Sequence, residues 1–354
     1  MEKDKESYVI PNFHHRKGVH CTSSALRNVF EFHTVKLSEA MVFGLGLGMG
    51  LSYLKIPGME PFFGGRNKDF VKDFCDTLKV GLNEFKTKDP EKGWLRLERR
   101  IKSNIPSVIN IDMAFLPYQD LPDDFHFGGH TIVACGYNPA TSTVLVTDTH
   151  FSDILEVPVE DLTKGRNSKK DKLMTPKNVI FEFSFTEDIP LLESVIERVL
   201  NNTGSNLLSK SGRVLKLMGI HAGTNGIEVF INNLDKWLKL TENTFELRFM
   251  QQAGYIGTKE FNYGTGGGLF RYLFSEFLEE SAIQTKNESL HGLSDFYSQL
   301  GEKWETVASL FEVVSRMTNP EKRKSMVSEI KTNLLEIKTL EEKGAHMLID
   351  FKLK

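Results

Sequence analysis

Apolar positions spaced three and four residues apart predict several helices in the first third of the chain. Residues 21–33 show this spacing, which predicts a helix that begins at or beside Cys21. A second helix is predicted to begin at Ser38, because serine is a favourable N-cap. The same spacing recurs over residues 67–80 and 91–103. These four segments are the helices expected in this part of the chain.

Continuous or alternating apolar runs predict strands in the middle of the chain. The run SVINIDM (107–113) is a candidate for a buried strand. HTIVACGY (130–137) and TVLVTDT (143–149) are two further strands, and NPATS between them has the composition of a turn. Residues 178–185 alternate apolar and polar side chains, which is typical of a half-buried strand. The strands on either side of NPATS are expected to form an antiparallel hairpin.

The pattern changes after Pro190. From there on, the apolar positions have a helical period and no strong strand signal is present. We therefore expect two domains, a mixed α+β domain over residues 1–187 and a mainly α-helical domain over residues 188–354. A chain of 354 residues is long enough for two such cores.

Composition is ordinary for a globular protein and argues against some classes of partner. The net charge of −3 gives no general reason to expect nucleic acid or an anionic membrane as a partner. The most apolar run, residues 41–54, is too short and too rich in glycine to span a bilayer. The N-terminal residues lack the apolar region of a secretory signal, so the cytoplasm is the expected location. The three cysteines form no CxxC pair, and no disulfide framework is expected.

The predicted hairpin brings a histidine and an acid together. His130 lies at the start of the first strand and Asp148 near the end of the second, and these two ends meet in an antiparallel pair. Two turn lengths are compatible with the sequence: one places His130 opposite Thr149 and the other opposite Phe151. In either register, a carboxylate beside the imidazole would fix its tautomer and stabilise its charged form.

Cys21 is the candidate nucleophile that this pair would activate. At a helix N-terminus, the backbone N–H groups and the helix dipole favour a thiolate. The backbone N–H of Cys21 itself could help to hold an oxyanion. The order of cysteine, histidine and acid along the chain is that of papain-like cysteine enzymes. The segment from Gly129 to Thr149 also resembles the leader peptidases of bacteriocin exporters.

Each of these three residues also has an ordinary structural interpretation. Cys21 could be a small buried hydrophobic residue. His130 could be a hydrogen-bonded histidine at a strand edge, and Asp148 could cap a turn. Their combination, in this order and on these element types, favours the catalytic interpretation.

Two groups of histidines raise a metal site as the chemical alternative. They are His14, His15 and His20 with Cys21, and His126, His130 and His150. Two of the three residues between His126 and His130 are glycines, so one helical face is not expected to present both imidazoles. The glycine-rich run of residues 43–51 likewise lacks the spacing of a nucleotide-binding loop. We therefore expect no metal and no cofactor.

Several short motifs occur in the order found in one known family. They are His20-Cys21-x-x-x-Ala25-Leu26-x-Asn28, Ser38-Glu39, Phe43-Gly44-Leu45-Gly46, Tyr53, Gly64-Gly65-Arg66, Asp112, Leu116-Pro117-Tyr118, Gly129-His130 and Asp148-Thr149. Together they resemble the N-terminal domain of the butirosin-biosynthesis protein H family. A second group looks like the helical domain of unassigned function that usually follows it. That group consists of Thr265-Gly266-Gly267-x-x-Phe270-Arg271 and Phe277-Leu278-x-Glu280.

The resemblance implies an activity and roles for the candidate residues. The namesake of the family is an acyltransferase of secondary metabolism, and its proposed fold is papain-like. It moves an amino-acyl group from an acyl-carrier-protein thioester to an amine of an aminoglycoside. Carried over to this chain, Cys21 is the nucleophile, His130 the base and then the acid, and Asp148 orients the imidazole. The expected partners are an acyl-carrier protein or another acyl thioester donor and a small amine acceptor.

The oxyanion donor departs from the usual papain-like pattern. Such enzymes often use a glutamine a few residues before the cysteine, but this chain has none before Gln119. His15, His20 or a backbone N–H group would have to take that role. Further candidates for substrate contact in the matched motifs are Arg66, Tyr118 and Arg271. At the start of a helix, Arg271 could bind an anionic group, or the glycines before it could simply cap and pack the helix.

Two other functions are compatible with the same residues. A cysteine peptidase or amidase would use the same triad to cleave an amide bond without a carrier-bound donor. A non-catalytic binding module would keep the fold. Its Cys21 thiol would be unreactive, and replacement of His130 would cause no loss of function. A thioester donor suits a thiol nucleophile, because thiol–thioester exchange is nearly isoenergetic and the amide formed afterwards drives the reaction, whereas exclusion of water would decide between a transferase and a hydrolase.

Overall fold

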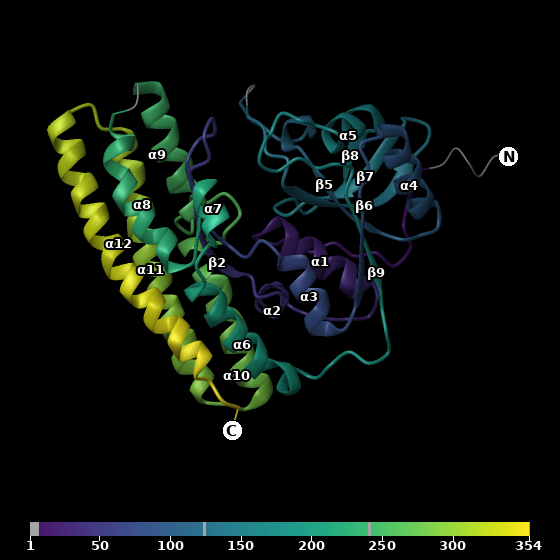
Figure 1. Cartoon of the computed structure of the whole chain (residues 1–354). Helices are drawn as coiled ribbons and strands as arrows, with labels where there is room; N and C mark the ends of the chain where they lie inside the picture. Colours follow the sequence, from purple (N-terminus) through teal and green to yellow (C-terminus); the bar gives the residue numbers. More distant parts are fainter. Residues whose placement is uncertain (1–6, 123–124, 240–241, 354) are drawn as a thin grey trace. The chain divides into compact units, whose positions relative to one another are not determined.

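The described part of the chain contains both helices and antiparallel strands. The computed structural model describes residues 7–122, 125–239 and 242–353 (Figure 1). Most of the strands precede residue 185, and most of the helical residues follow it. The mixed α and β class expected from the sequence is therefore confirmed, as is the helical character of the C-terminal part.

The chain divides into two compact units that are interleaved in sequence. The first unit is formed by the residues up to Val42 and by Lys79–Asp188, and the second by Phe43–Leu78 and the residues from Ile189 onward. The sequence predicted one change of domain near residue 187. In the structure, the chain passes from the first unit to the second at residue 188, and residues 43–78 also belong to the second unit.

The first unit is built on one antiparallel sheet. Its strands lie in the order β4-β9-β5-β6-β7-β8, and β1 pairs with the last residues of β6. The strands are β1 (Tyr8–Val9), β4 (Gly81–Phe85), β5 (Ser107–Ile111), β6 (His130–Asn138), β7 (Thr143–Thr147), β8 (Leu155–Pro158) and β9 (Ile180–Ser184). The strand that begins with His130 therefore lies near the centre of the sheet.

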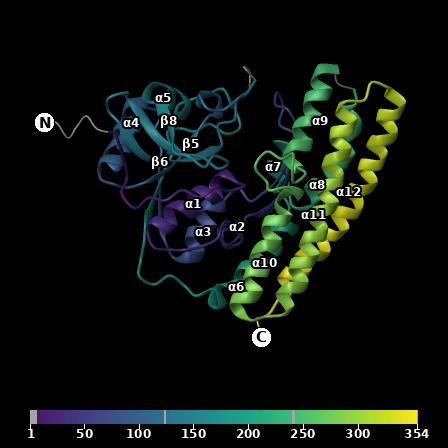
Figure 2. The same ribbon diagram turned by 180° about the vertical axis from the view of Figure 1, so that it is seen from behind.

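Helices cover both faces of this sheet (Figure 1, Figure 2). They are α1 (Cys21–Phe32), α4 (Pro90–Lys102) and α5 (Val159–Arg166), with the short 3-10 helix η2 (Met113–Phe115). Helices α4 and α5 pack on one face, where Leu97, Ile101 and Leu162 join the apolar side chains of the strands. Helix α1 lies on the other face, where the hydroxyl oxygens of Thr22 and Thr131 are 3.1 Å apart. The start of α1 is thereby held against the start of β6.

A β-bulge sets the register of the β6–β7 hairpin. Beside the turn, Asn138 pairs with Thr143. The register shifts between Ala134 and Gly136, so that Val133 pairs with Thr147 farther from the turn. This shift of one residue leaves the far ends of the two strands in a register between the two predicted from turn length.

The second unit is mainly helical. Its helices are α3 (Phe70–Leu78), α6 (Leu192–Leu208), α7 (Arg213–Leu217), α8 (Thr224–Trp237), α9 (Glu242–Ile256), the 3-10 helix η3 (Gly268–Phe270), α10 (Arg271–Thr285), α11 (Ser289–Ser315) and α12 (Pro320–Ile349). Helix α2 (Glu39–Leu45) begins in the first unit and ends in the second. The long helices α11 and α12 lie side by side (Figure 1).

A small sheet from the first third of the chain is built into the second unit. Its strands β2 (Met49–Leu54), β3 (Phe62–Arg66) and β10 (Ile220–Ala222) lie in the order β10-β2-β3. The ring of Phe63 stacks on the rings of Phe230 and Trp304, with centroids 4.9 Å and 5.4 Å away. The side chain of Gln252 makes two hydrogen bonds of 3.0 Å to the backbone of Phe63. The hairpin β2–β3 is therefore part of the core of the helical unit.

Candidate active site

Helix α1 begins at the predicted nucleophile. His20 has an extended backbone (φ −127°, ψ 129°) and is the N-cap, so that Cys21 is the first residue of the helix. The His20 imidazole accepts a hydrogen bond of 3.3 Å from the backbone N–H of Ser23, a role usually taken by a Ser, Thr, Asn or Asp side chain. Cys21 is only partly buried. The first N–H groups of a helix carry partial positive charge, which favours a negative charge on the sulfur.

The imidazole of His130 lies between a thiol and a carboxylate. Its Nε2 is 2.9 Å and 2.8 Å from the two carboxylate oxygens of Asp148. The Cys21 side chain is close enough to the same imidazole to raise its pKa through hydrogen bonding and charge. Since Nε2 faces Asp148, Nδ1 is the ring nitrogen left for Cys21. His130 and Asp148 are only 6% and 3% exposed. The structure thus brings together the three residues selected from the sequence.

This arrangement favours a positively charged imidazole. Burial by itself lowers the pKa of His130, but the charge of Asp148 and the hydrogen bonds to Asp148 and Cys21 outweigh it and raise the pKa to about 10. Burial by itself raises the pKa of Asp148, but the charge and hydrogen bond of His130 and the donors of Thr149 and Tyr118 lower it to about 2. At neutral pH these two side chains therefore form a buried ion pair.

Three further donors hold the Asp148 carboxylate in place. The backbone N–H of Thr149 donates to Oδ1 over 2.7 Å. The hydroxyl of Tyr118 and the amide N–H of Gln119 donate to Oδ2 over 3.0 Å and 3.1 Å. Burial and the neighbouring carboxylate raise the pKa of Tyr118, so it remains a neutral donor. Tyr118, a candidate for substrate contact, thus positions Asp148. Gln119 was not selected from the sequence, although it directly follows the matched motif Leu116-Pro117-Tyr118.

The two histidines considered as oxyanion donors have other contacts. The Nε2–H of His15 donates to the carbonyl of Phe151 over 2.7 Å, which leaves Nδ1 to accept an N–H from the Asn28 amide at 3.0 Å. Burial lowers the pKa of His15, so its ring is neutral and both ring nitrogens are occupied. His15 therefore fastens the loop at Phe151 and is not placed to donate to an oxyanion. In contrast, His20 uses only Nδ1 to cap α1, and because this nitrogen accepts a hydrogen bond, the ring hydrogen of a neutral His20 is on Nε2.

Arg66 and Arg271 belong to the second unit, whereas the site described above belongs to the first. The guanidinium of Arg271 is completely buried, and its Nε donates to Glu341 Oε1 over 2.8 Å. The indole N–H of Trp304 donates to the same oxygen over 2.7 Å. Of the two roles left open for Arg271, these contacts correspond to packing, because a buried and paired guanidinium does not present its charge to an anionic ligand. Arg66 ends strand β3, and its Cζ lies 5.7 Å from the centroid of the Phe70 ring.

The histidines considered as metal ligands do not converge with other ligands in the described residues. No three His, Cys, Asp or Glu side chains within residues 7–122, 125–239 and 242–353 are placed to hold a metal ion. His126 pairs instead with the buried Asp112, whose Oδ2 lies 2.9 Å from Nδ1 of the imidazole. In the same described part of the chain, no helix is both long and apolar enough to cross a lipid bilayer.

Two family models match successive parts of the chain. The family described as Butirosin biosynthesis protein H, N-terminal, matches residues 20–149, which include all three residues at the candidate site. The Domain of unknown function (DUF4872) matches residues 160–348, more than half of the chain. A comparison with curated proteins found no match. The resemblance inferred from the sequence motifs is confirmed: a region that matches the N-terminal domain of butirosin biosynthesis protein H is followed by the domain of unknown function, and the chain belongs to the DUF4872 family.

Proposed function

We propose that this protein is a cysteine-dependent acyltransferase of a butirosin-type biosynthetic pathway, with a papain-like first unit. The observation that carries the proposal is the position of His130, whose imidazole contacts the Cys21 thiol and the Asp148 carboxylate. The description of the matching family as a butirosin biosynthesis protein supports a biosynthetic role. A thiol at a helix start, facing an imidazole on an antiparallel sheet, supports the papain-like fold.

In the first step, the Cys21 thiolate attacks the carbonyl carbon of an acyl thioester. A new C–S bond forms to Cys21, and the C–S bond to the donor thiol breaks as the carbonyl re-forms. The departing thiolate takes the proton from Nδ1 of the His130 imidazolium, which leaves a neutral imidazole. The acyl group is then held on Cys21 as a thioester. The proposed donor is an acyl-carrier protein or another acyl thioester.

In the second step, a small amine attacks the acyl-enzyme. The amine nitrogen forms the amide bond, and the C–S bond to Cys21 breaks. Neutral His130 accepts the proton that the amine loses, which restores the imidazolium and the thiolate. Asp148 stabilises the imidazolium in both steps and keeps Nδ1 directed at the reacting atoms. Since both ring nitrogens of His15 have other contacts, the proposed oxyanion donors are the Nε2–H of His20 and the backbone N–H groups at the start of α1.

The state of charge of His130 makes the proposal testable before any substrate is identified. An imidazolium beside Cys21 keeps the thiol ionised well below the pH at which a free cysteine reacts. We expect iodoacetamide to alkylate Cys21 rapidly at about pH 6 and above, and we expect His130→Ala to abolish this reactivity at about pH 6. Peptide mass spectrometry assigns the labelled residue.

Two buried cysteines act as internal controls in this experiment. Cys75 and Cys135 are completely buried, and burial raises the pKa of each thiol to about 12. They should remain unlabelled while the protein is folded. Labelling of Cys21 no faster than that of Cys75, with no effect of His130→Ala, would contradict the catalytic proposal and leave a binding module.

A thioester donor then separates transfer from hydrolysis. Incubation with a small acyl thioester should add the mass of the acyl group to Cys21, and a subsequent amine should remove it as an amide. Loss of the acyl group at the same rate without an amine would indicate a hydrolase. Cleavage of peptides without any thioester would support the peptidase alternative instead.

A further inference from the structure

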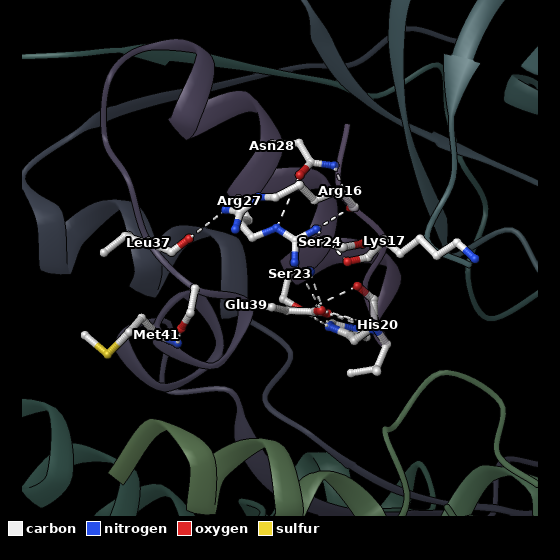
Figure 3. A network of polar contacts seen from close by, with 12 residues as sticks. Arg16, Lys17, His20, Ser23, Ser24, Arg27, Asn28, Leu37, Glu39 and Met41 are labelled. Carbon is white, nitrogen blue, oxygen red and sulfur yellow. Dashed lines mark hydrogen bonds and ion pairs between the residues drawn. The ribbon is translucent and has the colours of Figure 1, made fainter. Parts of the chain in front are cut away.

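The five residues that lead into the nucleophile are held by a buried ion pair (Figure 3). This pre-nucleophile segment comprises residues 16–20. The carboxylate of Glu39 accepts the backbone N–H of Val19 at 3.0 Å and that of His20 at 2.9 Å. Glu39 is only 9% exposed. One carboxylate therefore occupies the two backbone donors that directly precede Cys21.

The cation of the pair binds the other polar groups of the same segment. The Nη2 of Arg27 donates to the backbone carbonyls of Arg16 and Lys17, the latter over 2.9 Å. The Nη1 of Arg27 lies 3.7 Å from Oε2 of Glu39, and Arg27 is 6% exposed. The anion thus binds N–H groups and the cation binds carbonyls of one short backbone segment, as Figure 3 shows.

Glu39 also connects this segment to the first turn of α1. The hydroxyl of Ser23 donates to Oε1 of Glu39 over 2.9 Å and lies 2.9 Å from Nδ1 of His20. His20 is the N-cap of the helix, and its imidazole binds the backbone N–H of Ser23. The Glu39 carboxylate therefore contacts both partners of the N-cap hydrogen bond. Movement of Glu39 would therefore displace the helix start that carries Cys21.

The close approach of Glu39 requires glycine at position 18. A Cβ atom built on Gly18 would lie 2.5 Å from Oε2 of Glu39 and would also overlap Cβ of Ser24. Any larger residue would push the segment away from the carboxylate. This packing leaves the backbone of the pre-nucleophile segment little freedom of its own.

From this geometry, we propose that Glu39 is a positioning residue for Cys21. The inference rests on the proposed function. A buried ion pair is weak support for stability, because removing two charges from water costs about as much as their attraction returns. The contacts of this pair converge on the residues before the nucleophile. Glu39 therefore fixes where the sulfur lies relative to His130, and displacement by about 1 Å can slow a reaction about a hundredfold.

The test is the alkylation of Cys21 in Glu39→Gln, measured against pH. Glutamine has nearly the same shape, but its NH₂ group cannot replace Oε2 as the acceptor of the Val19 N–H, and it leaves Arg27 without a counter-charge. We expect alkylation near neutral pH to be roughly ten- to a hundredfold slower than in the natural sequence. The pH at which Cys21 becomes reactive should rise, which a purely structural role would not produce.

Glu98→Gln is the matched control. Glu98 lies on α4 of the same unit and pairs with Lys102 at 2.9 Å, so its replacement makes the same change of charge without touching the pre-nucleophile segment or Arg27. It should leave the alkylation of Cys21 unchanged. Protection of Cys135, which is completely buried in the sheet of the same unit, reports that the unit remains folded.

A second variant decides the result if Glu39→Gln exposes Cys135. Glu39→Asp keeps the charge opposite Arg27 but is one methylene too short to reach both N–H groups. Slow alkylation of Cys21 with Cys135 protected would support the proposal. Alkylation at the natural rate in a folded Glu39 variant would overturn it. If Cys21 is alkylated slowly in His130→Ala but at the natural rate in the Glu39 variants, only this inference fails. If neither substitution changes the rate of alkylation, the proposed function fails.

Discussion

At the scale of single residues, the ion pair of His130 and Asp148 has the clearest consequence for pH. Folding raises the pKa of His130 from 6.5 to about 10, because the neighbouring carboxylate outweighs the effect of burial. The folded state therefore binds this proton more tightly than the unfolded chain does. The contribution of Asp148 has the opposite dependence, since its pKa falls to about 2.

The stability contributed by His130 should accordingly disappear in alkaline solution. It is complete below the ordinary pKa of 6.5 and is lost as the pH rises towards about 10. The contribution of Asp148 is complete above the ordinary pKa of 3.8 and is lost as the pH falls through about 2. A Cys21 thiolate would offset the loss of the His130 contribution up to the free-thiol pKa of about 8.5, so urea unfolding between about pH 8.5 and pH 10 should show a steeper decline in the natural sequence than in His130→Gln. Parallel profiles would contradict this assignment of charge.

The candidate residues that the sequence indicated carry reactive groups, whereas those it did not indicate are recognisable only by their contacts in the folded chain. Cys21, His130 and Asp148 were selected because each has a distinctive chemistry and stands at the end of a predicted element. Gln119 and Glu39 instead bind other residues of the candidate site, namely the carboxylate of Asp148 and the backbone before Cys21. Nothing in their types or spacing indicates such a role without the folded backbone.

At the scale of elements, the predicted helices and strands of the first unit match the structure closely where the pattern is local. The helix predicted over residues 21–33 is α1, and the strands predicted over 130–137 and 143–149 are β6 and β7. Strands β2 and β3 were not predicted, because glycines interrupt the apolar pattern of residues 44–50 and 64–65. Their identity depends on partners far away in the sequence, such as Phe230 and Trp304.

The bulge in β6 offers a test at the scale of elements. A Cβ atom on Gly136 would overlap the backbone carbonyl of Tyr8 in β1 and lie 2.9 Å from Leu145. We expect Gly136→Ala to break the β1–β6 pairing and to lower the free energy of unfolding by about 1–3 kcal/mol. The amide of Ile10, which donates to the carbonyl of Cys135 over 2.8 Å, should exchange its hydrogen faster.

Gly212→Ala is the comparison for this substitution. A Cβ atom on Gly212 would meet no atom within 4 Å, so the free energy of unfolding should change little. Equal stability of the two alanine variants would show that the close approach at position 136 can relax without cost.

At the scale of the whole molecule, the interleaving of the two units is the dominant feature. Residues 43–78 contribute a helix and two strands to the unit that otherwise begins at Ile189. Sequence patterns predict two domains, but they do not reveal which core an apolar segment joins. The ring of Phe63 could be recognised as buried, whereas its stacking on Trp304 could not.

This interleaving predicts that the chain cannot be divided at residue 187. A chain ending there would keep β2 and β3 but lack the helices that cover Phe63 and bind its backbone. We expect trypsin to cleave such a chain rapidly after Arg66, at the end of β3, whereas the full chain should resist cleavage there. Mass spectrometry of timed digests would identify the site. A soluble truncated chain protected at Arg66 would contradict the division into units.

The same connectivity has a consequence for synthesis on the ribosome. The hairpin that carries Phe63 leaves the ribosome about 240 residues before Trp304 is added, which corresponds to roughly 10–50 s at typical rates of translation. For about the first 170 residues of that interval, until Phe230 is made, the ring of Phe63 has neither of its two stacking partners. The nascent protein therefore has to hold an unfinished hairpin in solution until its last helices are made.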